Sequence, residues 1–297
     1  MHKTNGMIVK SVRGFYFVET SDGIYKCNAK GIFRNKDIVP LVGDNVAIQI
    51  NNNGEGIITE IGARKTVLTR PPVANIEQLF IIVSVIDPVP NYLIIDKMIV
   101  IAHNSGITPV IIITKSDLSE AQAQQIYDIY KGCGYEVFVF SCINKTEDIT
   151  KIKEKMKGRI SAFTGNTGVG KSTLLNFINS ELNLKTGETS KKLGRGRHTT
   201  REVELFALDN GGYVADTPGF SMIDMQRYDI VLKDQIQFCY NEFEPYIGKC
   251  RFADCSHISE KGCAIVEALK NGEISQIRHD NYVTLYREAE KIKEWEI

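Results

Sequence analysis

The first 70 residues alternate between short apolar segments and clusters of turn-forming residues, a pattern typical of β-strands joined by hairpins. Asp22-Gly23 and Asn53-Gly54 stand in two of the turns, where both dipeptides accept the positive φ of a tight hairpin. Five strands are predicted, over residues 6–10, 15–20, 23–28, 44–50 and 56–61. Five short strands in about 60 residues suit a small barrel, for which the OB-fold is the best match.

The pattern changes after Pro71 and Pro72, which mark a boundary because prolines interrupt regular pairing. Continuous apolar runs predict buried parallel strands over 79–86, 108–114, 136–140 and 160–163, with two further strands near 203–208 and 213–215. Amphipathic segments between them predict helices over 92–104, 121–131, 148–157 and 172–179. This alternation predicts a doubly wound α/β sheet that binds its ligand at the carboxyl ends of the strands.

The last part of the chain is predicted to be mostly helical. A helix is expected over residues 281–295, because one stripe of it is apolar, namely Tyr282, Leu285, Tyr286, Ala289 and Ile292. His279 precedes this helix and is expected at the surface. The three patterns together predict three domains, over residues 1–70, 71–223 and 224–297.

Charge distinguishes the first domain from the rest. The 297 residues are 43% hydrophobic and have a formal net charge of zero, so the whole chain shows no basic signature for nucleic acid. Residues 1–70, however, contain ten Lys or Arg against six Asp or Glu, a balance of +4, interspersed with Phe15, Tyr16, Phe17, Tyr25 and Phe33. Basic residues with aromatics on a barrel favour RNA binding, although alternate residues such as Phe15 and Phe17 are more simply explained as barrel core.

The sequence also indicates a compartment. Residues 1–6 lack the apolar segment of a signal peptide, and the longest apolar run, 79–86, is too short to span a bilayer. A cytoplasmic, monomeric protein without membrane association is therefore expected. Seven cysteines in such a protein argue against a disulfide framework.

One stretch matches the G-x-x-x-x-G-K-[ST] pattern of a phosphate-binding loop. It consists of Gly165, Asn166, Thr167, Gly168, Val169, Gly170, Lys171 and Ser172, followed by Thr173. The glycines let successive N–H groups point at one anion, and the helix that follows adds its partial positive charge. Lys171 would contact the β- and γ-phosphates, and the Ser172 hydroxyl would bind Mg²⁺. The loop lies between a predicted strand and a predicted helix, as nucleotide binding requires.

Two further elements at strand ends would recognise guanine. Thr114-Lys115-Ser116-Asp117 resembles the N-K-x-D element of GTPases. The Asp117 carboxylate can accept hydrogen bonds from N1–H and the exocyclic amine of guanine, whereas adenine has no matching pair of donors. The aliphatic stem of Lys115 can lie along the base. Ser141-Cys142 could contact O6 of the base.

A third set of residues would surround Mg²⁺ and the γ-phosphate. Asp216-Thr217-Pro218-Gly219 resembles the D-x-x-G element, in which Asp216 would hold Mg²⁺ through water and the Gly219 N–H would sense the γ-phosphate. Thr199 or Thr200 could close over Mg²⁺, and Thr200 is the residue predicted.

The order of these elements is informative. In a usual GTPase the phosphate loop comes first and the N-K-x-D and Ser elements come last. Here the guanine elements at 114–117 and 141–142 precede the phosphate loop, so the order is circularly permuted. Such a permutation is permissible because the usual last helix ends near the usual first strand. Agreement of all elements in one cyclic order favours a GTPase over an α/β domain without nucleotide.

A cluster of soft ligands follows the α/β domain. Cys250, Cys255, His257 and Cys263 have the spacing C-x₄-C-x-H-x₅-C. Three thiolates and one imidazole fill a tetrahedral Zn²⁺ shell with no open position, so a structural zinc ion is predicted.

A permuted GTPase behind a small β-barrel and before a Cys/His cluster resembles the family of ribosome small-subunit-dependent GTPases A (RsgA, also YjeQ or YloQ). The resemblance covers essentially the whole chain. It implies an N-terminal OB-fold, a permuted P-loop GTPase domain and a C-terminal zinc domain. It also implies GTP hydrolysis stimulated by the 30S ribosomal subunit, contact with 16S rRNA and a role in late 30S maturation.

The sequence departs from the general GTPase pattern at two positions. Thr114 stands where the motif has Asn, so one contact to the base or to the phosphate loop is expected to be lost. Phe220 stands where many GTPases have the Gln that orients water, so intrinsic hydrolysis is expected to be slow. His198 is the candidate on this chain to position that water, although it could equally be a solvated loop histidine. The predicted catalytic residues are thus Lys171, His198, Thr200, Asp216 and Gly219.

His198 lies within a basic stretch, residues 191–201, which contains five positive charges and no acid. We expect this stretch to be a switch that orders on GTP or on rRNA. Two alternatives stay open: an RNA-binding adaptor whose nucleotide site is only structural, which Phe220 would favour, and a permuted GTPase that acts on another ribonucleoprotein or on a membrane.

Overall fold

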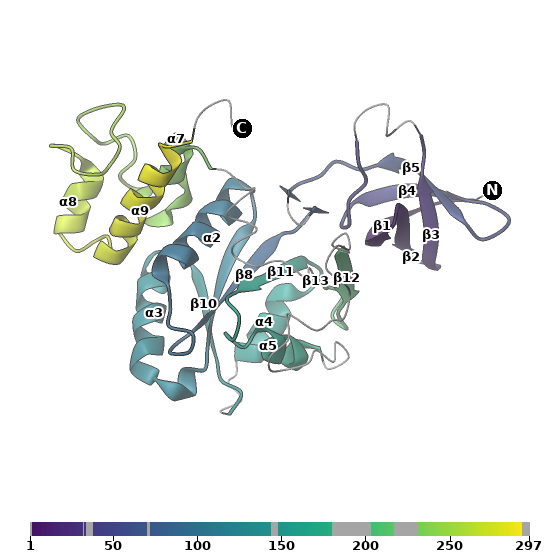
Figure 1. Cartoon of the computed structure of the whole chain (residues 1–297), viewed down its shortest axis with the longest axis horizontal. Coiled ribbons are helices and arrows are strands. Elements are labelled where there is room, and N and C mark those ends of the chain that lie inside the picture. Colours follow the sequence, from purple (N-terminus) through teal and green to yellow (C-terminus); the bar gives the residue numbers. More distant parts are fainter. Residues whose placement is uncertain are drawn as a thin grey trace.

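The computed structural model describes residues 2–31, 33, 38–69, 72–143, 148–179, 203–216 and 231–292 (Figure 1). The N-terminal part is a five-stranded barrel of OB-type topology. Its strands are β1 (His2–Val12), β2 (Phe15–Thr20), β3 (Gly23–Ala29), β4 (Asn45–Ile50) and β5 (Gly56–Ile61). The pairing order β1-β2-β3-β5-β4 closes through β1–β4, and β3–β5 is the parallel pair. All five predicted strands are confirmed, with β1 longer at both ends.

The barrel core differs from the prediction. Successive side chains of a strand point to opposite faces. In β2, Tyr16 and Val18 face inward, whereas Phe15 is 38% exposed and Phe17 is only partly buried. The explanation as a core residue is therefore wrong for Phe15, whereas Phe17 packs partly against the core. The Lys26 ammonium lies 4.0 Å from the centroid of the Phe15 ring, a cation–π contact on the outer face of the barrel.

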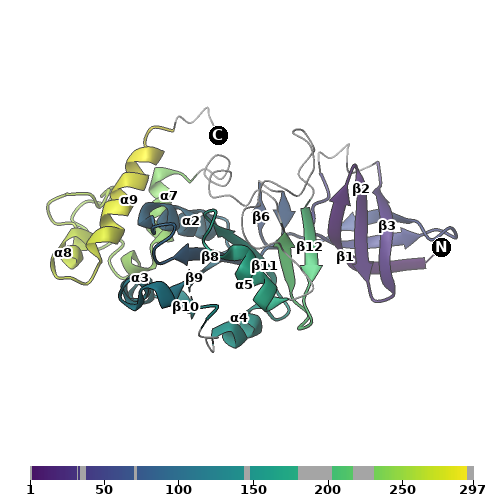
Figure 2. The same cartoon turned by 60° about the horizontal axis from the view of Figure 1, so that its bottom comes forward.

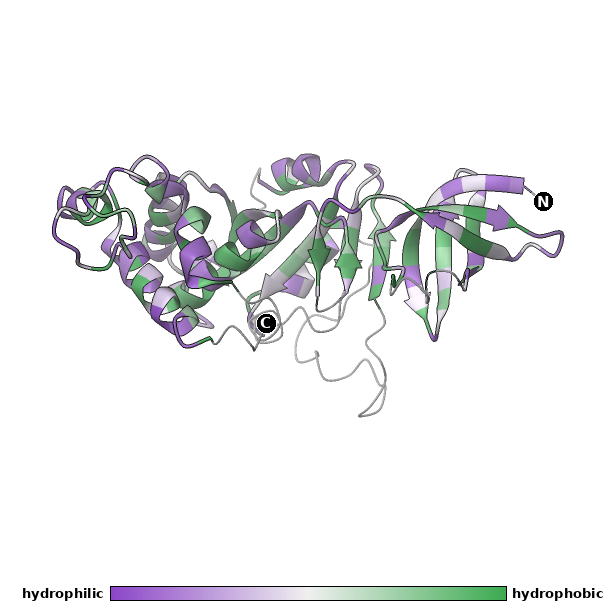
Figure 3. Ribbon diagram, turned by 90° about the horizontal axis from the view of Figure 1, so that it is seen from above, coloured by the Kyte–Doolittle hydropathy of each residue, from purple (hydrophilic) through white to green (hydrophobic). Residues whose placement is uncertain are grey.

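The central sheet is the doubly wound structure that the sequence predicted. Its strands run in the order β10-β9-β8-β11-β13-β12. Their bounds are β8 (Gln78–Ser84), β9 (Thr108–Thr114), β10 (Glu136–Phe140), β11 (Ile160–Gly165), β12 (Val203–Ala207) and β13 (Tyr213–Asp216). All neighbours are parallel except β12, which is antiparallel to β13. Figure 3 shows the central strands to be mainly hydrophobic, with polar residues at their ends, as expected for strands covered on both faces.

Helices cover both faces of this sheet. The first face packs against α2 (Tyr92–Asn104) and α3 (Glu120–Gly132), and the second against α4 (Asp148–Met156) and α5 (Lys171–Ile178). The alternation within β8 separates the two cores: Leu79 and Ile81 belong to the first, and Phe80 and Ile82 to the second. A short ribbon of β6 (Val67–Leu68) and β7 (Val73–Ala74) lies between the barrel and β8.

The C-terminal part is mostly helical. It contains α7 (Lys233–Ile236), the 3₁₀ turns η3 (Gln237–Cys239) and η4 (Asn241–Phe243), α8 (Ala264–Lys270) and α9 (Gln276–Ala289). The prediction for α9 is wrong at both ends, because the helix begins five residues earlier, after Ser275, and ends at Ala289 rather than at residue 295. The surface prediction for His279 is also wrong: this residue is only 4% exposed, and its Nε2 lies 2.8 Å from the His257 carbonyl oxygen, which accepts from it.

A buried charge cluster joins α9 to α2. Arg278 is fully buried, donates to the equally buried Asp96 and pairs through Nε with Glu242 Oε1 at 2.7 Å. The Tyr240 ring lies 4.3 Å from its guanidinium. Burial alone would lower the pKa of Arg278, but Asp96 and Glu242 raise it well above its ordinary value, so this arginine is ionised. The cluster fixes the C-terminal part on the first face of the sheet.

No helix in the described ranges is long and apolar enough to cross a membrane.

Candidate functional site: a nucleotide edge and a Cys/His centre

The predicted nucleotide elements meet at one edge of the sheet. The carboxyl ends of β8, β9, β10 and β11 are aligned, since Ser84 and Phe140 both pair with Thr114, and Gly165 pairs with Ile82. The segments that follow these strands include the guanine elements and the phosphate loop. The end of β13, Asp216, lies beside β11, because Ala215 pairs with Ala162. The circularly permuted elements are therefore adjacent in space although they are distant in sequence (Figure 2).

Glycine is needed at three positions of the phosphate loop, for different structural reasons. A Cβ on Gly165 would lie 2.9 Å from the Ile82 carbonyl oxygen and 2.9 Å from Val169 Cγ2, so only glycine fits where the loop leaves β11. Gly168 and Gly170 have φ values of +87° and +93°, in the left-handed region that glycine adopts without strain. Gly170 caps α5, which begins at Lys171. The loop thus leads directly from the end of β11 into the start of a helix at the sheet edge, an arrangement that suits anion binding.

Thr114 links the guanine element to the phosphate loop. Its side chain is buried, and Oγ1 donates to the Val169 carbonyl at 2.5 Å while lying 3.2 Å from the Val83 carbonyl. The contact to the loop that we expected to be lost is therefore made by the hydroxyl. Val169 is itself buried in the second core, so both ends of this hydrogen bond are held in place.

We predict that Thr114→Val weakens GTP binding by about tenfold. Valine has the same shape but leaves the buried Val169 carbonyl without its donor, at a cost of about 1–3 kcal/mol, and the loop is no longer held in its binding conformation. Titration with a fluorescent GTP analogue measures the change. Thr108→Val, at the exposed start of the same strand, is the matched control. Equal affinities of the two variants would contradict the role of Thr114.

The two guanine elements contact each other. Ser141 Oγ donates to Asp117 Oδ1 at 2.6 Å and accepts from the Ile143 N–H at 3.1 Å. Lys115 has a left-handed backbone (φ +56°), which turns the chain into η1 (Ser116–Leu118), and its Nζ donates to the Asp87 carbonyl. Cys142 is largely exposed beside them, and the partial burial of its thiol together with the Asp117 charge raises the pKa of that thiol. One carboxylate oxygen of Asp117 is thus oriented by Ser141.

Several predicted residues lie outside the described ranges. These are His198, Thr199, Thr200, Gly219, Phe220 and the basic stretch 191–201. Asp216 is described by its backbone, as the last residue of β13.

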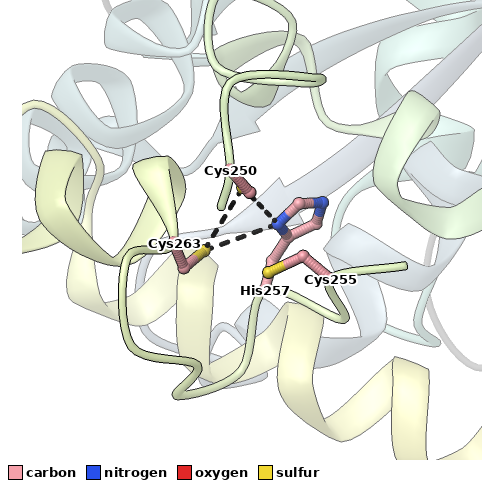
Figure 4. Close-up of side chains that lie close together, drawn as sticks. All are labelled: Cys250, Cys255, His257 and Cys263. Carbon is pink, nitrogen blue, oxygen red and sulfur yellow. Dashed lines mark hydrogen bonds between the residues drawn. The ribbon is translucent and has the colours of Figure 1, made fainter. Parts of the chain in front are cut away.

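The four predicted metal ligands come together in the C-terminal part (Figure 4). Cys250 Sγ lies 3.8 Å from Cys263 Sγ, and His257 Nδ1 lies 3.5 Å from each of these sulfurs. All four ligand atoms, including Cys255 Sγ, are within 4.8 Å of one another. A tetrahedral zinc ion with ordinary bond lengths separates two sulfurs by about 3.8 Å and a sulfur from a nitrogen by about 3.6 Å. The residues therefore fit Zn²⁺.

Hydrogen bonds outside the ligand set orient this centre. His257 Nε2 lies 2.9 Å from Gln237 Oε1, which makes Nε2 the protonated nitrogen and leaves Nδ1 to face the sulfurs. The N–H groups of Ala264 and Val266 donate to the sulfurs of Cys250 and Cys263.

The turn that carries His257 is held by Glu260. Its carboxylate accepts from the N–H groups of Ser256, Ile258 and Ser259 at 2.8–3.0 Å. Burial alone would raise the pKa of Glu260, but these bonds and the Ser256 hydroxyl lower it to about 2. Neither Gln237 nor Glu260 was predicted from the sequence. Gln237 precedes the first ligand by 13 residues and has no sequence signal, whereas Glu260, between two ligands, could have been noticed.

Comparisons with known proteins agree with this arrangement. The family model described as RsgA N-terminal domain matches residues 5–58, and the one described as RsgA GTPase matches residues 61–226. The small ribosomal subunit biogenesis GTPase RsgA of Caldanaerobacter subterraneus subsp. tengcongensis is 42% identical over 292 residues, which cover 98% of this chain and 97% of that relative. The RsgA of Geobacillus kaustophilus is 39% identical, over 97% of this chain and 98% of its own length.

Two solved structures share the fold. YjeQ from Thermotoga maritima superposes with a TM-score of 0.85 at 33% identity, covering 98% of this chain and all of that one. YloQ, described as a circularly permuted GTPase, has a TM-score of 0.81 at 32% identity, over 98% of this chain and 96% of its own. Because the two family models together match most of the chain and the relatives match nearly its whole length, this chain belongs to the RsgA family of circularly permuted GTPases.

Proposed function

We propose that this protein hydrolyses GTP while bound to the 30S ribosomal subunit and assists late maturation of that particle. The observation that carries the proposal is the alignment, at one edge of the sheet, of the strand ends that lead into residues 114–117, residues 141–142 and the phosphate loop, in a chain whose relatives are named small ribosomal subunit biogenesis GTPases. The protein acts as a cytoplasmic monomer that contacts 16S rRNA. Its functional units are residues 1–70, 71–223 and 224–297.

In this proposal the phosphate loop binds the phosphates of the nucleotide, and the guanine elements after β9 and β10 bind its base. The backbone N–H groups of residues 165–173 and the Lys171 ammonium bind the phosphates, and Asp117 accepts from the two guanine donors. Ser141 orients Asp117, and Thr114 holds the loop against the guanine element. Ser172, Thr200 and Asp216 are the groups that would hold Mg²⁺, which neutralises charge on the β- and γ-phosphates when bound.

The hydrolysis step depends on residues near the γ-phosphate. The Gly219 N–H senses that phosphate, and His198 positions the attacking water in place of the usual Gln. Phe220 can neither donate nor accept a hydrogen bond, so turnover by the protein alone is slow and the small subunit completes the site. The zinc ion has no open coordination position, so its role is structural.

GTP turnover by the purified protein, alone and with 30S, 50S or 70S particles, tests the proposal. We expect stimulation of about a hundredfold by 30S and none by 50S, because completing a transition-state site contributes factors of this size. Tight GTP binding with no turnover in any mixture would overturn the enzymatic assignment in favour of an RNA-binding adaptor. Stimulation by another particle alone would overturn the choice of partner.

A further inference from the structure

The barrel and the nucleotide sheet are joined by backbone pairing. Strand β1 of the barrel pairs antiparallel with β12, with Lys10 opposite Glu204 and Ser11 opposite Val203, so that the two sheets form one continuous sheet (Figure 2). Strand β12 pairs in turn with β13, where Glu204 lies opposite Asp216. Lys10, Glu204 and Asp216 are therefore successive partners across three neighbouring strands. This series of paired residues leads from barrel strand β1 to Asp216, the residue that would hold Mg²⁺.

Two polar side-chain links reinforce this pairing. Lys10 Nζ lies 2.7 Å from Glu204 Oε2, and the Tyr213 hydroxyl donates to Glu19 Oε2 at 2.9 Å. Burial and the neighbouring Glu19 raise the pKa of Tyr213 to about 12, which keeps this phenol a donor near neutral pH. Tyr213 begins β13 and Asp216 ends it. The β12–β13 hairpin is thus tied to β1 and β2 near both ends of β13.

The other side of the hairpin is fixed to the nucleotide site. Strand β13 pairs with β11, the strand that ends in the phosphate loop. At the hairpin turn, a Cβ on Gly212 would lie 2.2 Å from the Met156 carbonyl oxygen, so the turn is in close contact with the end of α4. The hairpin is therefore held between the barrel on one side and the strand that carries the phosphate loop on the other, so a displacement of the barrel would act directly on the hairpin. The quantity that changes is the position of Asp216 relative to that loop.

We infer that Glu204 and Tyr213 are positioning residues, which through Lys10 and Glu19 couple the barrel to the placement of Asp216. Since the barrel is one of the surfaces with which the protein would contact rRNA, docking of the barrel alters hydrolysis through this hairpin. The inference rests on the proposed function, because contact with rRNA is the event that would displace the barrel. The coupling between barrel and hairpin depends only on the contacts described above. The Lys10 and Glu204 side chains are 32% and 35% exposed, so the pair adds little to overall stability and its removal leaves the fold intact.

The test uses the double variant Glu204→Met with Tyr213→Phe, which removes both links without altering the barrel. The matched control is Glu136→Met with Tyr246→Phe, which removes a similar Lys155–Glu136 pair and a similar Tyr246–Glu273 hydrogen bond elsewhere. Hydrogen exchange of the amides in residues 203–216 is measured first, without ribosomes. We expect exchange to be about fivefold faster in the test variant and unchanged in the control.

Turnover with saturating 30S is measured second. The expected result is a maximal stimulated rate lowered by about fivefold, with the 30S concentration for half-maximal stimulation unchanged, whereas the control matches the wild type. A wild-type stimulated rate in the test variant would overturn the inference, as would weaker 30S binding with an unchanged maximal rate. If the wild type itself is not stimulated, the proposed function fails. In that case, hydrogen exchange in residues 203–216 and turnover without ribosomes test the coupling. Equal values in the test variant and the wild type would overturn the inference.

Discussion

Replacing Cys263 with serine is expected to release zinc and to unfold the C-terminal module, residues 231–292. Cys263 is almost fully buried, and its sulfur lies 3.8 Å from Cys250 Sγ and 3.5 Å from His257 Nδ1. Structural zinc ions contribute apparent binding free energies of about 10–16 kcal/mol in zinc-finger peptides, far more than a small helical module gains from packing. Loss of the ion removes the restraint that holds the ligand loops around α8.

The predicted zinc ligands and the aromatic core of this module are in direct contact. The His257 ring lies 6.4 Å from the ring of Phe243 and 6.5 Å from that of Tyr282, both of which are buried. Release of His257 therefore exposes the aromatic core. Zinc content and limited proteolysis measure the outcome, and treatment of the wild type with a strong chelator should reproduce it.

Cys142→Ser is the control, because Cys142 is exposed and lies outside the cluster. We expect this variant to keep one zinc ion per chain and to resist protease like the wild type. A Cys263→Ser variant that keeps a full zinc complement would contradict the assigned ligand set. A metal-free variant that stays protease-resistant would show instead that packing around Arg278 and Asp96 holds the module together.

Replacing Asp117 with asparagine is expected to transfer nucleotide preference from guanine to xanthine. The carboxylate offers two acceptors to the two donors of guanine, whereas asparagine offers one acceptor and one donor. Xanthine carries a carbonyl oxygen where guanine has its amine, so it matches asparagine. A site built for hydrogen bonds rejects a mismatched ligand strongly, and we expect GTP affinity to fall by about a thousandfold.

The Ser141 contact makes this substitution conservative. Ser141 Oγ donates to Asp117 Oδ1 at 2.6 Å, and an asparagine can keep that bond with its carbonyl oxygen while its amide faces the base. Titrations with GTP and with xanthosine triphosphate measure the change. Asp128→Asn, at the exposed hydrogen bond with Gln124 on α3, is the control and should bind GTP normally. Equal losses for both nucleotides would show that Asp117 supports the loop rather than the base.

Local pattern alone located most elements and most candidate site residues. The bounds of α2, β2, β9 and β10 agree with those predicted, because apolar runs and turn residues act over short distances along the chain. The motif order likewise indicated a permuted GTPase, and the Cys/His spacing indicated one metal centre. Each of these signals is contained in a few consecutive residues, so no knowledge of distant contacts was needed.

Tertiary structure decided the properties that depend on residues far apart in the chain. Which alternate face of β2 points inward depends on barrel closure, so Tyr16 rather than Phe15 is buried. Arg278 and His279 would ordinarily be solvated, but their partners, Asp96 and the His257 carbonyl, come from 182 and 22 residues away. A charge or an imidazole is buried only where such partners offset its desolvation, and single-sequence patterns do not contain that information.

The same distinction applies to the nucleotide site. From the sequence, specific residues could be predicted to bind phosphate, guanine and zinc, because these chemistries need fixed residue types at short spacing. Only the folded chain decided that Thr114 bonds the phosphate loop, that Gln237 orients His257, and that barrel strand β1 pairs with β12 beside Asp216. These contacts join segments separated by 20 to 194 residues, and they form only when the fold brings those segments together.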